Sequence, residues 1–484
     1  MRLSRDRKHP ARHGPTHRVW HRVTRRVENA TGRGFRRRRL PYVVICLAAR
    51  LDLRFAGAVS VLESLIAKLK SVCAGLPDRR KSPRREGEYS MADIGVSAFS
   101  VFFMGSPSFL GHQRALQAGH GRSNCQTLFG MTAIPTDAHI RQMLDGAQPA
   151  SFDKLFFETI ETPGVLAPFE RLGGRIAIAL DGTEHFCSRK IHCPRCSRRK
   201  RSDGRTEYFH AFLGASIVAP GHQQVLPLPA EFIVPQDGAE KQDCERNAAK
   251  RWLARHGPAV AHLRPVYLGD DLFACQPIAT AIQQAGGNFI LTCKPSSHQT
   301  IAEYLRGAEL EEHRQTTVTR GKRTITIYRW LCDVPLRATD DALTVNWFSV
   351  EIQNAKAKRT YYNSFITDLP VTAGTVVELA ACGRARWKIE NETFNVLKTN
   401  GYNLEHSFGH GKETLASVLV VLNLFAFGLH TAAKLSVLAW REAVTARGAA
   451  YRFFEHLRTV TAYVVFQSWD HLLRSIAAAA VRPP

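Results

Sequence analysis

The order of short apolar segments after residue 175 constrains the fold of this chain more than any other feature. Three β-branched segments predict strands at RIAIALD (175–181), EYFHAFLGASIVA (207–219) and QVLPLPAEFIV (224–234). They are followed by a helix over 240–257 that ends at Gly257-Pro258, a strand over 265–271, a helix over 274–287 and a strand over 288–294. Strands that alternate with helices favour an α/β fold, in which helices flank a sheet and its later strands run parallel.

The 484 residues are more than one ordinary core needs, and the sequence divides them further. We expect a basic arm over 1–60, a helical region over 61–170, the first part of the sheet over 171–314, an all-β insertion over 315–370, the rest of the core over 371–435 and a helical region over 436–484. Residues 1–60 are either a disordered arm or sequence upstream of the true start. The region 61–170 either binds DNA ends or packs on the next domain, and Thr136 or Asp137 is expected to cap a helix ending near Gly146.

Two of the predicted strands end in aspartate. Asp181 closes IALD, and Asp270 closes VYLGD, where Asp271 is the alternative. Because ligands gather at the carboxyl ends of strands in an open α/β sheet, we expect these carboxylates to lie close together. They repel one another unless a cation lies between them, and carboxylate oxygens suit Mg²⁺. A single aspartate at a strand end is more often a turn residue, so the prediction depends on a third carboxylate nearby.

The segment RARWKIENETFNVLKTNGYNLEH (384–406) offers that third carboxylate on a helix predicted over about 375–400. At about 100° per residue, the face with the large apolar side chains holds Trp387, Glu390, Asn391, Phe394, Leu397 and Lys398. The opposite face holds Lys388, Glu392, Asn395 and Thr399. We therefore expect the first face to pack on the sheet and to bring Glu390 to the aspartates, with Glu392 in solvent. Arg386, one turn earlier, could hold a phosphate or orient the carboxylate.

Three segments, LDGTEHF, YLGDDLF and RWKIENETFNVLKTNGYNLEH, resemble the DDE transposases of bacterial insertion sequences, over roughly residues 60–435. The resemblance implies an RNase H-like mixed sheet with a β-strand insertion. It implies that Asp181, Asp270 and Glu390 bind Mg²⁺, for which Mn²⁺ substitutes, and that Arg386 and Lys398 bind DNA phosphate. It further implies two-metal-ion DNA cleavage and strand transfer by a homodimer on paired element ends, acting on double-stranded end and target DNA.

Two positions depart from the signature of that family. The family has a Tyr where Gly383 stands, and its Lys lies seven residues after the Glu, whereas Lys398 lies eight after Glu390.

A cysteine cluster follows Asp181 in the segment HFCSRKIHCPRCSRRKRSDGRTEYFH (185–210). Cys193 and Cys196 have the spacing of half a zinc site, which Cys187 with His185, His192 or His210 could complete. The alternative is a loop of free thiols between the first two strands. The eleven cysteines of the chain are scattered and odd in number, which argues against a disulfide framework and indicates a reducing, cytoplasmic compartment.

The net charge of +24 favours an anionic partner, and nucleic acid is the first candidate. Residues 1–60 carry more than half of that excess, so charge alone does not establish a DNA-binding core. No membrane span is expected, because the apolar run Leu415–Leu429 is interrupted by Asn423 and is short. We expect a nucleoid-associated transposase. The alternatives are a catalytically inactive or domesticated zinc-containing DNA-binding protein of the same fold, a zinc-containing regulator, and a hydrolase that uses paired carboxylates.

Overall fold

The structure is a computed structural model that describes residues 61–80, 88–235 and 243–479. The chain divides into two compact units, Met1–Ala58 and Val59–Pro484, and every described residue belongs to the second. The predicted basic arm over 1–60 therefore lies outside the described residues.

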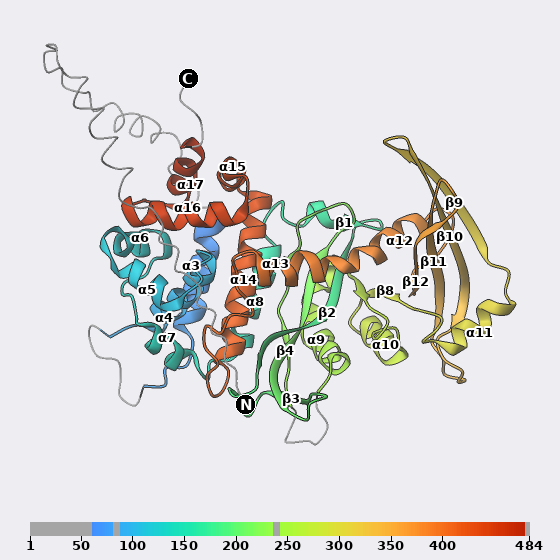
Figure 1. Cartoon of the computed structure of the whole chain (residues 1–484), viewed down its shortest axis with the longest axis horizontal. Coiled ribbons are helices and arrows are strands. Elements are labelled where there is room, and N and C mark those ends of the chain that lie inside the picture. Colours follow the sequence, from blue (N-terminus) through green and yellow to red (C-terminus); the bar gives the residue numbers. More distant parts are fainter. Residues whose placement is uncertain (1–60, 81–87, 236–242, 480–484) are drawn as a thin grey trace, which may run out of the picture. The chain divides into compact units, whose positions relative to one another are not determined.

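A mixed sheet of twelve strands forms the centre of the second unit (Figure 1). Its main path is β3 (Ser197–Lys200), β4 (Thr206–Val218), β2 (Arg175–Ser188), β7 (Val266–Gly269), β8 (Asn288–Thr292), β12 (Arg359–Thr367), β11 (Thr344–Asn354), β10 (Lys322–Pro335) and β9 (Glu311–Thr319). Three short strands lie off this path: β1 (Glu170–Arg171) pairs with β2, and β5 (Leu226–Pro227) and β6 (Glu231–Ile233) pair with β4. The prediction of an α/β fold with a mixed sheet is confirmed.

Only the centre of this sheet is parallel, through the neighbours β2, β7 and β8. Strand β4 runs antiparallel to β2, and β12 runs antiparallel to β8. The predicted β-strands over 315–370 are present as β9 to β12, with β9 starting at Glu311, and they extend the same sheet beyond β8. The insertion thereby covers the β8 edge, which would otherwise expose unpaired backbone groups.

Helices cover both faces of the parallel strands. Side chains alternate along β2, so Ile178 and Leu180 pack in one core cluster with α9 (Glu245–Val260) and α10 (Gln276–Gln284). Ala177 and Ala179 pack in the other cluster, with residues of α12 (Val376–Arg384), α13 (Asn395–Thr399) and α14 (Leu415–Ser436). Figure 1 shows α12 and α13 in line, between the β-rich end of the unit and α14.

One local prediction was wrong, and two need refinement. The predicted end at Gly257-Pro258 was wrong, since α9 continues through Pro258 to Val260. Gly257 packs so closely on Ala285 that a Cβ there would lie 2.7 Å from the Ala285 Cβ. The segment 185–210 is not a plain loop, since β2 runs on to Ser188 and β3 lies within it. The predicted helix over 375–400 is present from Val376 to Thr399, and it contains a 3₁₀ turn at Ala385–Trp387 and a π-helical turn at Ile389–Phe394.

Helices from both ends of the unit pack into one bundle. They are α3 (Val61–Ala74), α4 (Met91–Phe103), α5 (Phe109–Gln117), α6 (Gly119–Phe129), α7 (Asp137–Leu144), α8 (Asp153–Ile160), α15 (Leu438–Arg447), α16 (Ala450–Tyr463) and α17 (Trp469–Ala478), with α11 (Gln299–Gly307) beside the β-rich end. Short 3₁₀ turns occupy Pro149–Phe152, Ala167–Phe169 and Ala261–Leu263. The predicted cap of α7 is confirmed, because the Thr136 hydroxyl accepts a hydrogen bond from the His139 amide.

Helix α14 is the single helix in 61–80, 88–235 and 243–479 whose length and composition would allow a membrane span. Of its most apolar window, 94% is buried inside the protein. The Asn423 amide that interrupts this helix donates to the Tyr402 carbonyl oxygen at 2.9 Å. These are the surroundings of a core helix, as the sequence predicted.

Candidate active site

Asp181 and Asp270 lie on the same face of two adjacent parallel strands. The register pairs Ala179 of β2 with Leu268 of β7, and each aspartate follows two residues later. Ala179 and Leu268 both point into the cluster shared with α12 to α14, so the alternation of a strand turns both carboxylates toward that side. The charge of Asp270 raises the pKa of Asp181, which agrees with their proximity.

Glu390 joins these carboxylates through Arg386. One guanidinium nitrogen, Nη1 of Arg386, donates to Asp181 Oδ2 at 3.1 Å and lies 2.8 Å from Glu390 Oε1. Arg386 and Glu390 stand one turn apart on their helix, while Asp181 comes from a strand 205 residues earlier in the chain. A single cation thus bridges two of the three predicted metal ligands.

Burial is the largest cause of an unusual pKa at Asp181, which rises to about 7. The Arg386 guanidinium opposes this rise, while the charges of Glu390 and Asp270 add to it. Three acidic groups around one arginine leave an excess of negative charge in a partly enclosed place. Such a place favours protons or metal cations, since either relieves the repulsion.

The helix that carries Glu390 is fitted to the sheet at a glycine. Gly214 of β4 is the register partner of Asp181, and a Cβ at Gly214 would lie 2.7 Å from the Phe394 ring. Beside it, the hydroxyls of Ser216 and Thr393 share a buried hydrogen bond of 3.0 Å. The π turn, in which the Asn395 amide donates to the Glu390 carbonyl oxygen, lets the neighbours Thr393 and Phe394 both face the sheet.

The predicted helix faces are correct in turning Glu390 rather than Glu392 toward Asp181, but other residues on them lie differently. Asn391, expected on the sheet, is exposed, and Glu392, expected in solvent, is half-buried. Glu392 lines a cavity of about 370 Å³ with Tyr402, His430 and Lys434, away from Asp181. Trp387 was expected on the sheet but is 45% exposed, whereas Lys388, expected in solvent, is 7% exposed. The 3₁₀ and π turns rotate the helix relative to a uniform 100° per residue, so Ile389 takes the buried place expected for Trp387.

The choice between Asp270 and Asp271 is decided by their partners. Asp271 accepts hydrogen bonds from the Lys294 amide at 2.7 Å and the Ser297 hydroxyl at 2.6 Å, and its Oδ1 lies 3.2 Å from His298 Nε2. It therefore holds the loop after β8. Among the hydrogen bonds found in the described part of the chain, the Asp270 carboxylate accepts only a local bond, from the Leu272 amide, and its charge acts on Asp181 and Glu245.

A fourth carboxylate, Glu245, reaches this site and was missed from the sequence. It stands in the first turn of α9, and a Cβ at Gly182 would collide with its Oε1. Burial, and then the charge of Asp270, raise the pKa of Glu245. An acidic residue in a first helical turn is common because it suits the helix dipole, so its position carried no signal of a site.

The two departures from the family signature have structural causes. A Cβ at Gly383 would lie 2.8 Å from Phe365 and 3.0 Å from Ile290, so α12 packs too closely on β8 and β12 for a tyrosine. The π turn contains one extra residue. Lys398, eight residues after Glu390, therefore points in the direction that the seventh residue after Glu390 would take in a regular α-helix. Lys398 pairs with Glu405 at 2.8 Å, and its charge acts on His185.

A second polar cluster lies at the β3–β4 edge of the same sheet. Cys193, Cys196, His210 and His410 present ligand atoms that all lie within 4.8 Å of one another, and they could hold a metal ion. The prediction that Cys187 takes part was wrong, because β2 turns its Sγ toward Glu207 Oε2, at 3.6 Å. His185 and His192 are also outside the cluster, and His192 instead stacks on Tyr208. His410 was missed because it follows Cys196 by 214 residues.

Comparison with known proteins adds no relative: no protein-family model matches the chain, and no curated protein matches it.

Proposed function

We propose that this chain is a DNA transposase of the DDE type, which binds the ends of its own insertion sequence and catalyses DNA cleavage and strand transfer. The observation that carries the proposal is the bridge of Arg386 between Asp181 and Glu390, with Asp270 on the adjacent strand. Residues far apart in the sequence meet there in the arrangement that the resemblance implies. The spatial strand order, with β4, β2, β7 and β8 adjacent and β4 alone antiparallel among them, supports an RNase H-like core.

In this proposal Asp181, Asp270 and Glu390 hold Mg²⁺, for which Mn²⁺ can substitute. The donors fit such ions, because all are carboxylate oxygens and their mutual repulsion is relieved by divalent charge. Bound Mg²⁺ supplies Lewis-acid activation of a water or a DNA 3′-hydroxyl and stabilises the leaving oxygen. Arg386 neutralises part of the carboxylate charge and orients Glu390, and it can turn to a DNA phosphate when a cation takes its place.

The partners in this proposal are those that the resemblance implies. The substrate is double-stranded DNA at the element ends and at the target, and the enzyme works as a homodimer on paired ends near the nucleoid. Zn²⁺ is proposed for the second cluster and is argued below.

The test is cleavage of DNA that contains the sequences flanking the gene. Purified chain with Mg²⁺ is expected to nick at the element ends, while Asp181→Ala and Asp270→Ala should lose nicking and keep DNA binding in a gel-shift assay. Glu392→Gln serves as a control for loss of an acidic side chain. Nicking that survives either aspartate change would refute the metal-site assignment.

The alternative is a catalytically inactive zinc-containing DNA-binding protein of the same fold, and the Cys/His cluster is the observation in its favour. It predicts tight DNA binding without nicking by the unaltered chain under Mg²⁺ or Mn²⁺.

A further inference from the structure

Four of the six distances among the Cys/His ligand atoms match the edges of a tetrahedral metal site, and the other two are within 4.8 Å. The Sγ atoms of Cys193 and Cys196 are 3.9 Å apart, and His210 Nε2 lies 3.5 Å and 3.4 Å from them. His410 Nε2 lies 3.7 Å from Cys196 Sγ. Zinc bonds of about 2.3 Å to sulfur and 2.0–2.1 Å to nitrogen give tetrahedral edges of about 3.8 Å between sulfurs and about 3.5 Å between sulfur and nitrogen. The measured distances match these edges.

The donor types select zinc and a closed site. Two thiolates and two imidazoles suit Zn²⁺, and four protein ligands leave no position for a substrate. A disulfide does not explain the arrangement, because the sulfurs are 3.9 Å apart and two imidazoles converge on them. The Cys193 and Cys196 sulfurs sit in a tight turn, in which the Cys196 amide donates to the Cys193 carbonyl oxygen and the Cys193 amide points at the Cys196 sulfur.

The ligands come from three separate parts of the chain. Cys193 and Cys196 precede the short strand β3, and His210 lies on β4, four residues before the Gly214 on which Phe394 packs. His410 belongs to the loop over 400–414, which begins where the helix of Glu390 ends. A metal ion here would therefore join the β3–β4 edge of the sheet to the segment that follows Glu390.

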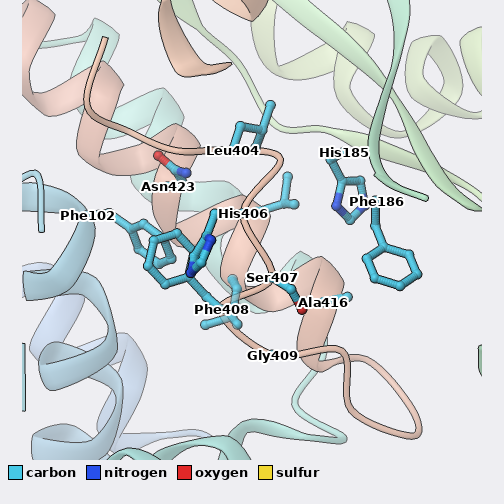
Figure 2. Close-up of a pocket in the computed structure, with 12 residues that line it drawn as sticks. Phe102, His185, Phe186, Leu404, His406, Ser407, Phe408, Gly409, Ala416 and Asn423 are labelled. Atoms are coloured by element: carbon cyan, nitrogen blue, oxygen red, sulfur yellow. The ribbon is translucent and has the colours of Figure 1, made fainter. Parts of the chain in front are cut away.

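Further contacts of this loop run to the helical bundle. The Asp145 carboxylate accepts hydrogen bonds from the amides of the loop end at Lys412, Glu413, Thr414 and Leu415. Arg141 Nε donates to the Phe408 carbonyl oxygen at 2.8 Å. Figure 2 shows the loop residues from Leu404 to Gly409 with Phe102 of α4 on one side and His185 and Phe186 of β2 on the other. They line a cavity of about 30 Å³, so packing between loop and sheet is incomplete there.

We propose that Cys193, Cys196, His210 and His410 bind one structural zinc ion that fastens the loop over 400–414 to the sheet edge and thereby fixes the end of the helix that carries Glu390. The proposal does not depend on the transposase assignment, since it concerns metal content and the anchoring of a loop. The zinc ion would act as a clamp, that is, as a link between the sheet and the helical bundle. It is separate from the carboxylate site, which has different ligands.

Metal content of the purified full chain tests the site directly. We expect about one zinc per chain in the unaltered protein and a loss of that zinc in Cys193→Ser and His410→Gln. Two matched controls should keep it: Cys187→Ser, on the neighbouring strand end, and His406→Gln, in the same loop. Zinc that is absent from the unaltered chain, retained by His410→Gln or lost in the controls would overturn the ligand set, and iron in its place would overturn the choice of metal.

A second measurement covers the case in which a variant fails to fold. Full chain loaded with Co²⁺ should show the visible absorption of tetrahedral cobalt with thiolate ligands, and Cys187→Ser should show the same spectrum. A spectrum typical of octahedral cobalt would refute the tetrahedral site. With Mg²⁺ held constant, a zinc-selective chelator should speed tryptic cleavage at Lys412 by about tenfold or more, because the loop loses its anchor on the sheet. Unchanged cleavage after zinc removal would refute the clamp.

Discussion

The acidic site and the Cys/His cluster are built on different strands of one sheet, and they differ in how the protein supports them. At the acidic site like charges crowd together, one arginine compensates part of them, and Glu390 remains exposed to solvent. In the Cys/His cluster four donors from three segments converge within 4.8 Å, and Cys196 and His210 are buried. The first arrangement is destabilising by itself and open to a ligand, while the second is closed. Openness with uncompensated charge is what a catalytic centre needs, and closure suits a structural one.

The largest effect expected is loss of cleavage on neutralising the exposed carboxylate of the acidic site. Glu390→Gln keeps the size of the side chain but removes its charge, and we expect Mg²⁺-dependent nicking to fall by about 10²- to 10³-fold or more. Glu392→Gln, two residues away and lining another cavity, should nick at the rate of the unaltered chain. Zinc content should stay the same in both variants, because neither Glu390 nor Glu392 is a ligand of the Cys/His cluster.

The opposite result, an inactive Glu392→Gln and an active Glu390→Gln, would show that the π turn presents the other glutamate to the metal.

A smaller loss is expected from moving the helix without touching a carboxylate. Gly214→Ala places a methyl group against Phe394, so the helix must shift by a fraction of an ångström or more. Misplacement of Glu390 on that scale should slow nicking by roughly 10- to 100-fold. Gly307→Ala is the matched control, since a Cβ there meets no atom within 4 Å. Equal nicking rates for the two alanine variants would mean that Phe394 does not set the position of Glu390.

The sequence predicted the parts of the fold that depend on local patterns. The strand at 175–181 and the strands around 207–219 and 265–271 were found because alternation and β-branched residues are read within a few residues. The end of α9 at Gly257-Pro258 was wrong, since the helix continues to Val260, and the close packing of Gly257 on Ala285 is not visible in the local pattern. The turn types at Ala385–Phe394 were also missed, since they depend on how Thr393 and Phe394 meet β4.

The same reasoning separates the site residues that were found from those that were missed. Asp181 and Asp270 are marked by the apolar segments that precede them, although β2 continues past Asp181 to Ser188, and Glu390 is marked by an amphipathic helix face. Glu245 and His410 carry no such mark, because each reaches its cluster only through the tertiary path of the chain. Cys187 was included on spacing alone, and the alternation of β2 directs it toward Glu207 instead.

The smallest expected effect is on folding stability without Mg²⁺, and it differs between Asp181 and Asp271. Burial raises the pKa of Asp181 to about 7 in the folded chain, so the folded state binds more protons than the unfolded state between the ordinary carboxyl pKa and about 7. Stability should therefore fall as the pH rises through that window. Hydrogen bonds from Lys294, Ser297 and His298 lower the pKa of Asp271, so its contribution is present at neutral pH and is lost only in acid, as the pH falls through its folded pKa.

Asp181→Asn should accordingly gain stability relative to the unaltered chain between about pH 4 and pH 7, by on the order of 1 kcal/mol, with a constant difference at higher pH. Asp271→Asn should be destabilised across the same range, because it loses bonds that the ionised carboxylate accepts. Urea unfolding in Mg²⁺-free buffer at several pH values measures both differences. If the stability gain of Asp181→Asn disappears when Mg²⁺ is added, Mg²⁺ offsets the charge repulsion at the acidic site. That result would distinguish the acidic site from the Cys/His cluster. If the free energy of unfolding depends on pH in the same way for Asp181→Asn and Asp271→Asn, the acidic site does not lower the stability of the fold.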